Sequence, residues 1–282
     1  MFLVSNGFFL PSHIEAMMFR DPIYAVTVCV NYGDFLQAIA PHNSPLFDKW
    51  VIVTTPDDDE TRAVCHKFGF TCVLSEEHRK TGGSVGKFNK GAMVDRGLQM
   101  CPRDSWRLHL DSDIVLPAQF RHLLEIADPR PGNLYGIDRV NVQGWDQWQA
   151  LLKSGFMHHA ADMHHLNCIE LPKGIPVGAR WASWRTGWVP LGFFQMWHSV
   201  DDEKGWAMTK HYPKNSGDAC HSDTQHAFQW DRKNRVFIPE VVGVHLDSEP
   251  SHTGANWNGR KTKRFGPPSA TPAATAQIKY PS

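Results

Sequence analysis

The sequence predicts an α/β fold, in which a mostly parallel sheet is flanked by helices and followed by an irregular, aromatic-rich C-terminal region. In the first half, apolar β-branched runs alternate with segments whose apolar residues have helical spacing. The second half is less regular and holds most of the 11 tryptophans and 16 histidines. With 282 residues, of which 41% are hydrophobic, the chain is long enough to bury a large core.

The first two predicted strands each end at a polar loop. Residues 24–30 form a β-branched run that stops at Asn31-Tyr32-Gly33, and residues 50–54 form another that stops before Asp57. In open α/β sheets ligands bind beyond the carboxyl ends of the strands, so both loops are candidate ligand contacts.

A short helix and a third strand follow. The apolar residues between positions 60 and 68 suit a helix, capped by Thr61 or a preceding aspartate and stopped by Gly69. Residues 71–74 then form a strand. This alternation of strands and helices favours a layered α/β domain with a largely parallel sheet.

The remaining elements of the first half lead to a pair of carboxylates. Val85, Phe88, Ala92 and Met93 have helical spacing, residues 107–110 predict a strand, and residues 134–142 predict another. The strand at 107–110 runs into Asp111-Ser112-Asp113.

Asp111 and Asp113 are a candidate pair of metal ligands. In an extended chain residues i and i+2 point to the same side, so both carboxylates can converge on one hard cation while Ser112 faces away. A D-x-D triplet alone is weak evidence, because Asp57-Asp58-Asp59 contains one too, in a polar segment that reads as a loop. Asp111-Ser112-Asp113 differs from that triplet because it lies at the end of an apolar strand.

Four motifs in order make residues 24–120 resemble a GT-A-fold glycosyltransferase of the family 2 type. These are VNYGDF, WVIVTTPDDDET, FNKGAMVDRGL and HLDSDIVLP. The resemblance implies a Rossmann-like GT-A domain that binds a nucleotide-sugar donor, with a UDP-sugar expected. It places the donor near Asn31, Tyr32, Asp57, Asp58 and Ser112.

The third motif departs from the family at Asp95-Arg96-Gly97, where many relatives have Ala-Arg-Asn-x-Gly. Either Lys87, Lys90 or Arg96 could therefore face the donor. For Lys87 and Lys90 a solvated helix face is the alternative. The basic end of the polar segment 251–264, with Arg260 and Lys261, is a further candidate to fold over a diphosphate, or else a solvated surface.

The same resemblance implies a third metal ligand and a catalytic base. Residues 236–244 predict a strand that runs into His245, where many GT-A enzymes keep a metal-binding histidine. Imidazole beside two carboxylates suits Mn²⁺ better than Mg²⁺. Asp223, expected to open a helix, matches the general base of inverting relatives; Asp218 is its rival, and helix capping is the alternative role.

Residues 186–197 resemble the glycine-and-aromatic segment that forms the floor of the sugar site in GT-A enzymes. Glycine permits close backbone approach, and aromatic faces suit sugar rings. The alternative is that these aromatics belong to the core.

Other functions fit the sequence less well. The segment around residues 82–88 is not a P-loop, because Thr81 stands where that motif requires glycine and Phe88 where it requires Ser or Thr. The histidine pairs His158-His159 and His164-His165 lack the spacing of a zinc site. A nucleotidyltransferase of related fold, or a non-catalytic glycan-binding protein, remains as an alternative to the metal-dependent glycosyltransferase. The acceptor is a glycan or another hydroxyl-bearing molecule, and a modified nucleobase is not excluded.

Composition places few other constraints. Lys plus Arg and Asp plus Glu both number 29, so no net charge favours nucleic acid or anionic lipid. The six cysteines form no C-x-x-C pair, and no segment has the roughly 20 apolar residues that span a bilayer. We expect a cytoplasmic protein with reduced thiols, one catalytic domain over residues 1–265 (donor half 20–120, acceptor half 121–265) and a flexible tail over 266–282.

Overall fold

A computed structural model of the chain describes residues 19–79, 88–156, 175–178, 181–199, 211–214, 219–248, 256–257 and 259–268. Several features predicted from the sequence lie outside these residues: the apolar N-terminus, the 82–87 segment with Lys87, the paired histidines, Asp218 and most of the tail after residue 266.

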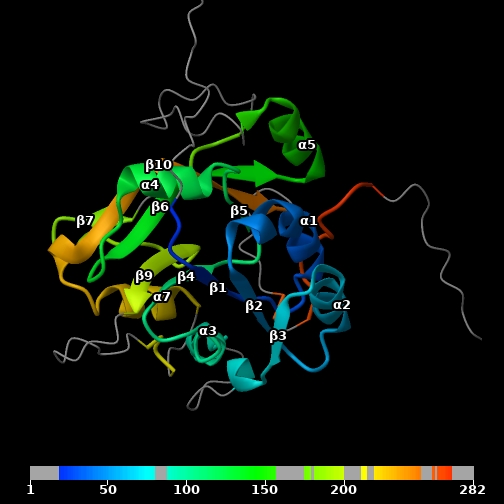
Figure 1. The fold of residues 1–282 in the computed structure, drawn as a ribbon. Coiled ribbons are helices and arrows are strands. Elements are labelled where there is room, and N and C mark those ends of the chain that lie inside the picture. Colours follow the sequence, from blue (N-terminus) through cyan, green and yellow to red (C-terminus); the bar gives the residue numbers. More distant parts are fainter. Residues whose placement is uncertain are drawn as a thin grey trace, which may run out of the picture.

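An eight-stranded sheet forms the centre of the fold (Figure 1). Its strands lie in the order β3-β2-β1-β4-β9-β6-β10-β5. They are β1 (Ile23–Val28), β2 (Lys49–Thr54), β3 (Thr71–Leu74), β4 (Ser105–Leu110), β5 (Ile114–Val115), β6 (Leu134–Gln143), β9 (Phe194–Ser199) and β10 (Arg235–Asp247). A separate hairpin is formed by β7 (Ala182–Ser183) and β8 (Gly187–Trp188).

Strand direction brings distant loops to one edge of this sheet. Strands β1, β2, β3 and β4 are mutually parallel, and β6 is parallel to β10. Strand β9 is antiparallel to both β4 and β6, so β6 runs in the same direction as β4. The carboxyl ends of β1, β2, β4, β6 and β10 therefore share an edge with the amino end of β9.

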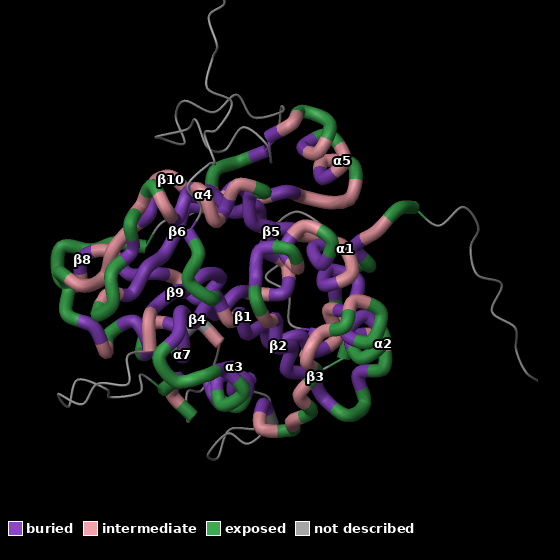
Figure 2. The backbone as a smooth tube through the Cα atoms, in the orientation of Figure 1, coloured by how far each residue is buried: buried purple, intermediate pink, exposed green. Residues whose placement is uncertain are grey.

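Helices cover both faces of the sheet. They are α1 (Gly33–Asn43), α2 (Asp59–Phe68), α3 (Lys90–Leu98), α4 (Phe120–Ala127), α5 (Trp145–Lys153) and α7 (Ala219–Ala227). Buried side chains of α1, α2, α4 and α5 belong to one hydrophobic cluster, and those of α3 and α7 to a second. Figure 2 shows the central strands mostly buried, with exposed stretches on helices such as α2 and α5.

The predicted α/β class and most of the predicted elements are confirmed. Helix α2 has Asp58 as its N-cap, accepting from the Thr61 amide, and Gly69 ends it in the left-handed conformation at φ 70°. Strands β3, β4 and β6 lie where the sequence predicts them. The alternation along β1 and β2 sends Ile23, Ala25 and Ile52 to one cluster and their neighbours to the other.

Two expectations about element boundaries were wrong. Strand β10 continues through His245 to Asp247 because it pairs with both β6 and β5, so His245 lies within the strand and not after it. Helix α7 contains Asp223 in its interior, so this residue does not open the helix as we expected.

The sequence analysis did not predict α1, α4, α5 or β9. Helix α1 begins at a glycine and contains Pro41, both of which are typical of loops, yet Phe35, Leu36 and Ile39 bury one face of it. Strand β9 contains the last four residues of the glycine-and-aromatic segment 186–197, of which Phe194, Met196 and Trp197 are buried. The alternative that these aromatics belong to the core is therefore the correct one for them.

The side chains of four of the six cysteines, and all the named helices, lie within the described residues. Cys29, Cys65 and Cys101 are free and buried, and Cys72 is free and exposed. Among the residues the structure describes, no helix is both long and apolar enough to cross a bilayer.

Gly97 allows α3 to pack directly on the sheet. A Cβ atom at this position would lie 2.4 Å from Val26 Cγ1 and 2.8 Å from Val53 Cγ2. We expect Gly97→Ala to lower the free energy of unfolding by about 1–3 kcal/mol, because helix and strands must separate to admit the methyl group. Denaturant unfolding measures this change.

Gly266→Ala is the matched control, because nothing lies within 4 Å of a Cβ atom there. It should change stability by less than about 0.5 kcal/mol. Equal stability of the Gly97→Ala protein and the wild type would show that α3 does not rest on the sheet at this distance.

Candidate active site at the carboxyl edge of the sheet

The loops after β1, β2 and β4 meet at the carboxyl edge. Asn31 follows β1 with φ 60°, a left-handed conformation that asparagine tolerates better than most residues. The backbone N–H of Asn31 donates to Asp58 Oδ2 at 2.7 Å. Asp58 also accepts from the Thr54 and Thr61 hydroxyls, so this buried aspartate caps α2 and holds the loop after β1 in place.

Asp113 and His245 are neighbours. His245 Nε2 lies 3.5 Å from Asp113 Oδ2, and Leu246 N donates to the Asp113 carbonyl at 2.8 Å. Burial lowers the pKa of His245, but the Asp113 carboxylate outweighs it and the pKa is raised. Burial raises the pKa of Asp113, but the charge of His245 and its hydrogen bond lower it by more, so the pKa of Asp113 lies below its usual value.

The Asp113–His245 pair fits two adjacent ligands of a divalent cation. Two ligand atoms about 2.1 Å from a metal lie about 3.0 Å apart at a right angle and farther apart at wider angles. Asp113 Oδ1 is buried and has no hydrogen-bond partner within the described part of the chain. However, no group of three or more His, Cys, Asp or Glu side chains is gathered as a metal site among those residues.

Asp111 turns to a different partner. Lys90 Nζ, at the start of α3, lies 2.7 Å from Asp111 Oδ1 and 3.1 Å from Asp223 Oδ2. Burial lowers the pKa of Lys90, but the two carboxylates raise it above its usual value. The predicted donor-contact, metal-ligand and base residues Lys90, Asp111 and Asp223 thus form one ion-paired cluster.

Gly192 provides the space that Asp223 occupies. A Cβ atom on Gly192 would lie 1.8 Å from Asp223 Cγ, so no side chain fits at this position. Gln195 then fixes the backbone on both sides, because its Nε2 donates to the carbonyls of Pro190 and Asp223 at 2.9 and 3.0 Å. The predicted glycine-bearing floor therefore lies directly against the predicted base.

A buried histidine completes this cluster. His109 Nε2 lies 3.6 Å from Asp111 Oδ1 and 4.0 Å from Asp223 Oδ1, while Nδ1 faces the Val26 carbonyl. Burial and the Lys90 ammonium lower the pKa of His109 to about 3. The imidazole is therefore neutral at pH 7, and Lys90 is the cation that balances the two carboxylates.

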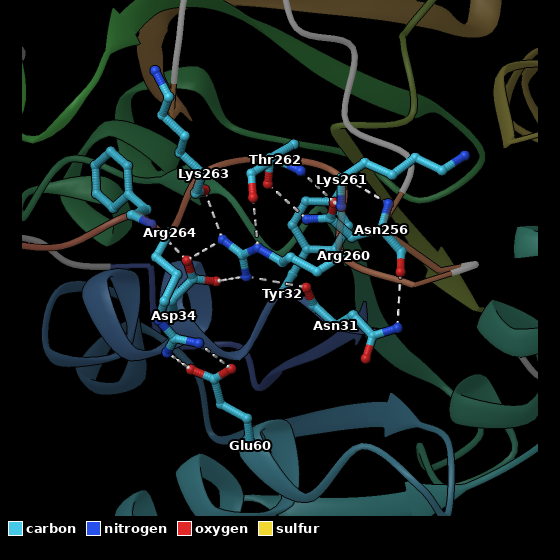
Figure 3. Close-up of polar contacts among 11 residues, drawn as sticks. Asn31, Tyr32, Asp34, Glu60, Asn256, Arg260, Lys261, Thr262, Lys263 and Arg264 are labelled. Atoms are coloured by element: carbon cyan, nitrogen blue, oxygen red, sulfur yellow. Dashed lines mark hydrogen bonds and ion pairs between the residues drawn. The ribbon is translucent and has the colours of Figure 1, made fainter. Parts of the chain in front are cut away.

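The segment from Asn256 to Phe265 is tied to the start of α1 (Figure 3). The Arg260 guanidinium forms a bidentate pair with the buried Asp34 carboxylate, at 2.7 and 2.5 Å, and reaches the Asn31 carbonyl at 3.4 Å. Phe265 N donates to Asp34 at 2.6 Å, and the Phe265 ring stacks on Phe35. Of the two alternatives for this segment, a solvated surface is excluded for Arg260, whose charge is already paired.

The predicted donor contacts differ in what they can offer. Tyr32 follows Asn31, and both Asp113 and Asp111 contribute to raising the pKa of its phenol after burial, which places the ring beside the carboxylates. Ser112 is buried, whereas Asp57 and the Lys261 side chain are exposed. Lys87 lies outside the described residues.

The sequence analysis missed four residues of this region: His109, Gln195, Tyr212 and Arg139. His109 had a signal, because Arg107, His109 and Asp111 alternate with Leu108 and Leu110 and so share a side of β4. Tyr212 packs edge-on against His109 and its hydroxyl donates to Gln195. Arg139 lowers the pKa of Asp113 and stacks over Phe193, a contact that only the packing of β6 on β9 creates.

Comparison with known proteins gives only partial structural matches. No protein-family model and no curated protein sequence matches the chain. One matched structure is glucosyl-3-phosphoglycerate synthase from Mycobacterium tuberculosis with Mn²⁺, UDP-glucose and phosphoglyceric acid: TM-score 0.33, 18% identity, 43% of this chain and 44% of that chain covered.

Two further matches have similar extents. The same enzyme with Mn²⁺, UDP and glucosyl-3-phosphoglycerate gives a TM-score of 0.33 at 18% identity, covering 57% of each chain. A mycobacterial protein gives 0.34 at 16% identity, covering 60% of this chain and 58% of that one. The chain therefore spans about half the length of these structures.

Removal of the Lys90 charge should destabilise the fold. Lys90→Ala leaves Asp111 and the largely buried Asp223 without their shared cation, and breaking such a pair costs about 3 kcal/mol. Denaturant unfolding of the variant measures the loss.

Lys153→Ala, at an exposed position at the end of α5, is the control and should cost less than about 1 kcal/mol. A Lys90→Ala protein as stable as this control would mean that water, not Lys90, solvates the two carboxylates.

Proposed function

We propose that this protein is a metal-dependent glycosyltransferase that moves a sugar from a nucleotide-diphosphate donor to an acceptor hydroxyl. The observation that carries the proposal is the division of labour within Asp111-Ser112-Asp113. One carboxylate lies beside His245, a metal-ligand type, and the other lies beside Lys90 and Asp223. Under this proposal the sheet edge would hold a cation at one carboxylate and a base beside the other.

Asp113 and His245 would hold the cation, with Mn²⁺ preferred over Mg²⁺ because imidazole is a ligand. When bound, such an ion stabilises the negative charge that develops on a departing diphosphate. Asp111 would complete the site by turning from Lys90 toward the metal or donor. That movement would leave the Lys90 ammonium close to the diphosphate as a second positive charge.

The loops around this site would contact the rest of the donor, for which a UDP-sugar is our proposal. Tyr32 and Asn31 lie at the end of β1, where an aromatic ring and an amide could face the nucleotide. Asp57 and Lys261 have exposed side chains that could reach it. Arg260 and Asp58, whose charges are engaged within the protein, would act by fixing these loops rather than by touching the donor.

Asp223 would act as the general base if the reaction inverts the anomeric centre. Its carboxylate would then take the proton of the acceptor hydroxyl as that oxygen attacks the sugar C1 and the C1–diphosphate bond breaks. Lys90 and the absence of a side chain at Gly192 fix the position of this carboxylate. The sugar transferred would be a hexose or a pentose.

Metal and donor binding test the proposal directly. Purified protein is titrated with Mn²⁺ by electron paramagnetic resonance and with a panel of nucleotide sugars by calorimetry, with and without EDTA. We expect a donor to bind only with metal, and Asp113→Asn to weaken Mn²⁺ binding about tenfold or more. Asp146→Asn, at an exposed position on α5, should bind Mn²⁺ as the wild type does. The proposal fails if no nucleotide sugar binds with any metal.

Asp223→Asn separates catalysis from donor binding. The amide keeps the size of the carboxylate but cannot accept a proton, so transfer should fall about 10²-fold or more while the donor still binds. Nucleoside-diphosphate release with a hydroxyl-bearing acceptor measures transfer, and Asp146→Asn, exposed on α5, is again the control. Undiminished transfer by Asp223→Asn would remove this residue from the mechanism.

A further inference from the structure

An exposed aromatic and cationic surface lies beyond the end of α7. It consists of Trp181 just before β7, Trp184 and Arg185 in the β7–β8 turn, Phe228 after α7, Arg232 in the 3-10 turn Arg232–Asn234, and Arg235 at the start of β10. The exposed fractions of Trp184, Phe228 and Trp181 are 85%, 47% and 39%. Large aromatic rings exposed as a group, unlike single ones, mark binding surfaces.

The hairpin is held in place by contacts beneath the rings. Arg235 donates to the Thr186 carbonyl at 2.8 Å, and Arg232 reaches the Trp184 carbonyl at 3.5 Å. Gly187, at φ 68°, leaves room for Arg232, whose Nε would lie 2.4 Å from a Cβ atom there. The turn is closed by Ser183 and Thr186, whose hydroxyls lie 2.7 Å apart. These contacts fix the hairpin backbone, and with it the position of the aromatic residues that it carries.

Positive charge is concentrated among these rings. The Arg185 guanidinium lies 5.6 Å from the centre of the Trp184 ring, and that of Arg235 lies 5.4 Å from the centre of the Phe228 ring. Burial and the nearby Arg232 lower the pKa of Arg235, and Asp231 partly opposes them. The neighbouring guanidinium groups of Arg232 and Arg235, with Arg185 on the adjacent turn, favour an anion in their vicinity.

The surface is connected to the proposed base. Phe228 lies five residues beyond Asp223, about 7.5 Å along a helix axis, and its amide donates to Thr224. On the other side, the chain runs from Trp188 to Gly192, which packs against Asp223. Trp181 and Phe228, whose ring centres are 6.2 Å apart, join these two paths. The rings and the carboxylate are thus carried by the same two short segments of the chain.

We propose that this surface binds the acceptor, and that the acceptor is an oligosaccharide carrying an acidic group. Exposed tryptophan faces suit the C–H faces of sugar rings, the arginines suit a carboxylate or phosphate, and Ser183 and Thr186 add hydroxyls at the turn. This assignment of the acceptor class rests on the proposed function.

A polynucleotide fits the surface less well. Sequence-independent binding to single strands uses a cationic groove that follows many phosphates, combined with stacked bases. Here the cations occupy one hairpin and the start of one strand, and the whole chain carries no net charge. A bilayer surface also fits less well, because the hairpin turn that carries Trp184 continues with Arg185 and Thr186.

Binding of defined oligosaccharides tests this proposal without any donor. Calorimetry would compare tetragalacturonate and a heparin tetrasaccharide with uncharged maltotetraose. We expect the wild type to bind at least one acidic probe more tightly than maltotetraose. Trp184→Ala and Arg185→Ala should each weaken that binding about tenfold. Leu74→Ala is the control and should leave it unchanged, because Leu74 is also an exposed large apolar residue but lies on β3.

The same variants are titrated with an eight-residue oligothymidylate and with vesicles containing phosphatidylserine. The proposal is overturned if neither acidic probe binds, if Trp184→Ala binds them as the wild type does, or if Trp184→Ala loses only oligothymidylate or vesicle binding. Nucleotide-sugar binding, measured separately, should be unchanged in Trp184→Ala. A wild-type protein that binds no nucleotide sugar would reject the proposed enzyme, whereas a wild-type protein that binds nucleotide sugars but neither acidic saccharide would reject only this surface.

Discussion

The buried Lys90 ammonium is the interaction on which the rest of this site depends. Two carboxylates, one from the end of β4 and one from α7, approach the same point, and without a cation their repulsion and desolvation would drive these elements apart. Lys90 can reach them because Asn89 caps α3 at this edge and Gly91 lets the helix approach; a Cβ atom on Gly91 would lie 2.1 Å from the Pro213 carbonyl. One ion-paired lysine thus joins α3, β4 and α7.

A second buried charge stabilises the opposite side of the site. Asp34 accepts from Arg260 and from Phe265 N, and so links the start of α1 to a segment more than 220 residues later in the chain. The Asn256 carbonyl accepts from Asn31, and its amide approaches the Tyr32 hydroxyl. The loop after β1 therefore has its conformation set by residues from the end of the described chain. Loops held in this way present their polar groups in fixed directions, as a binding site needs.

Short-range sequence signals account for the elements that the sequence predicted correctly. The strands are recognisable because β-branched runs alternate or stay apolar, and α2 because its cap and its terminal glycine are short-range signals. The position of Asp111 and Asp113 at a strand end follows from the same reasoning. Helix α1 and strand β9 were not recognisable, because a proline and a cluster of glycine and aromatic residues disguise them. Burial against the sheet, which no local pattern contains, decides both.

The sequence by itself determined the fold class, the strand-end location of Asp111-Ser112-Asp113 and the set of residue types available for chemistry. Only the tertiary structure decided how they are partnered: Asp113 with His245, Asp111 and Asp223 with Lys90, and Arg260 with Asp34. It also showed that His109 is buried and neutral beside them. The reason is physical. Periodicity and capping act over a few residues, whereas the cost of burying a charge is met by whichever oppositely charged group the packed elements bring within about 4 Å, regardless of its distance along the chain.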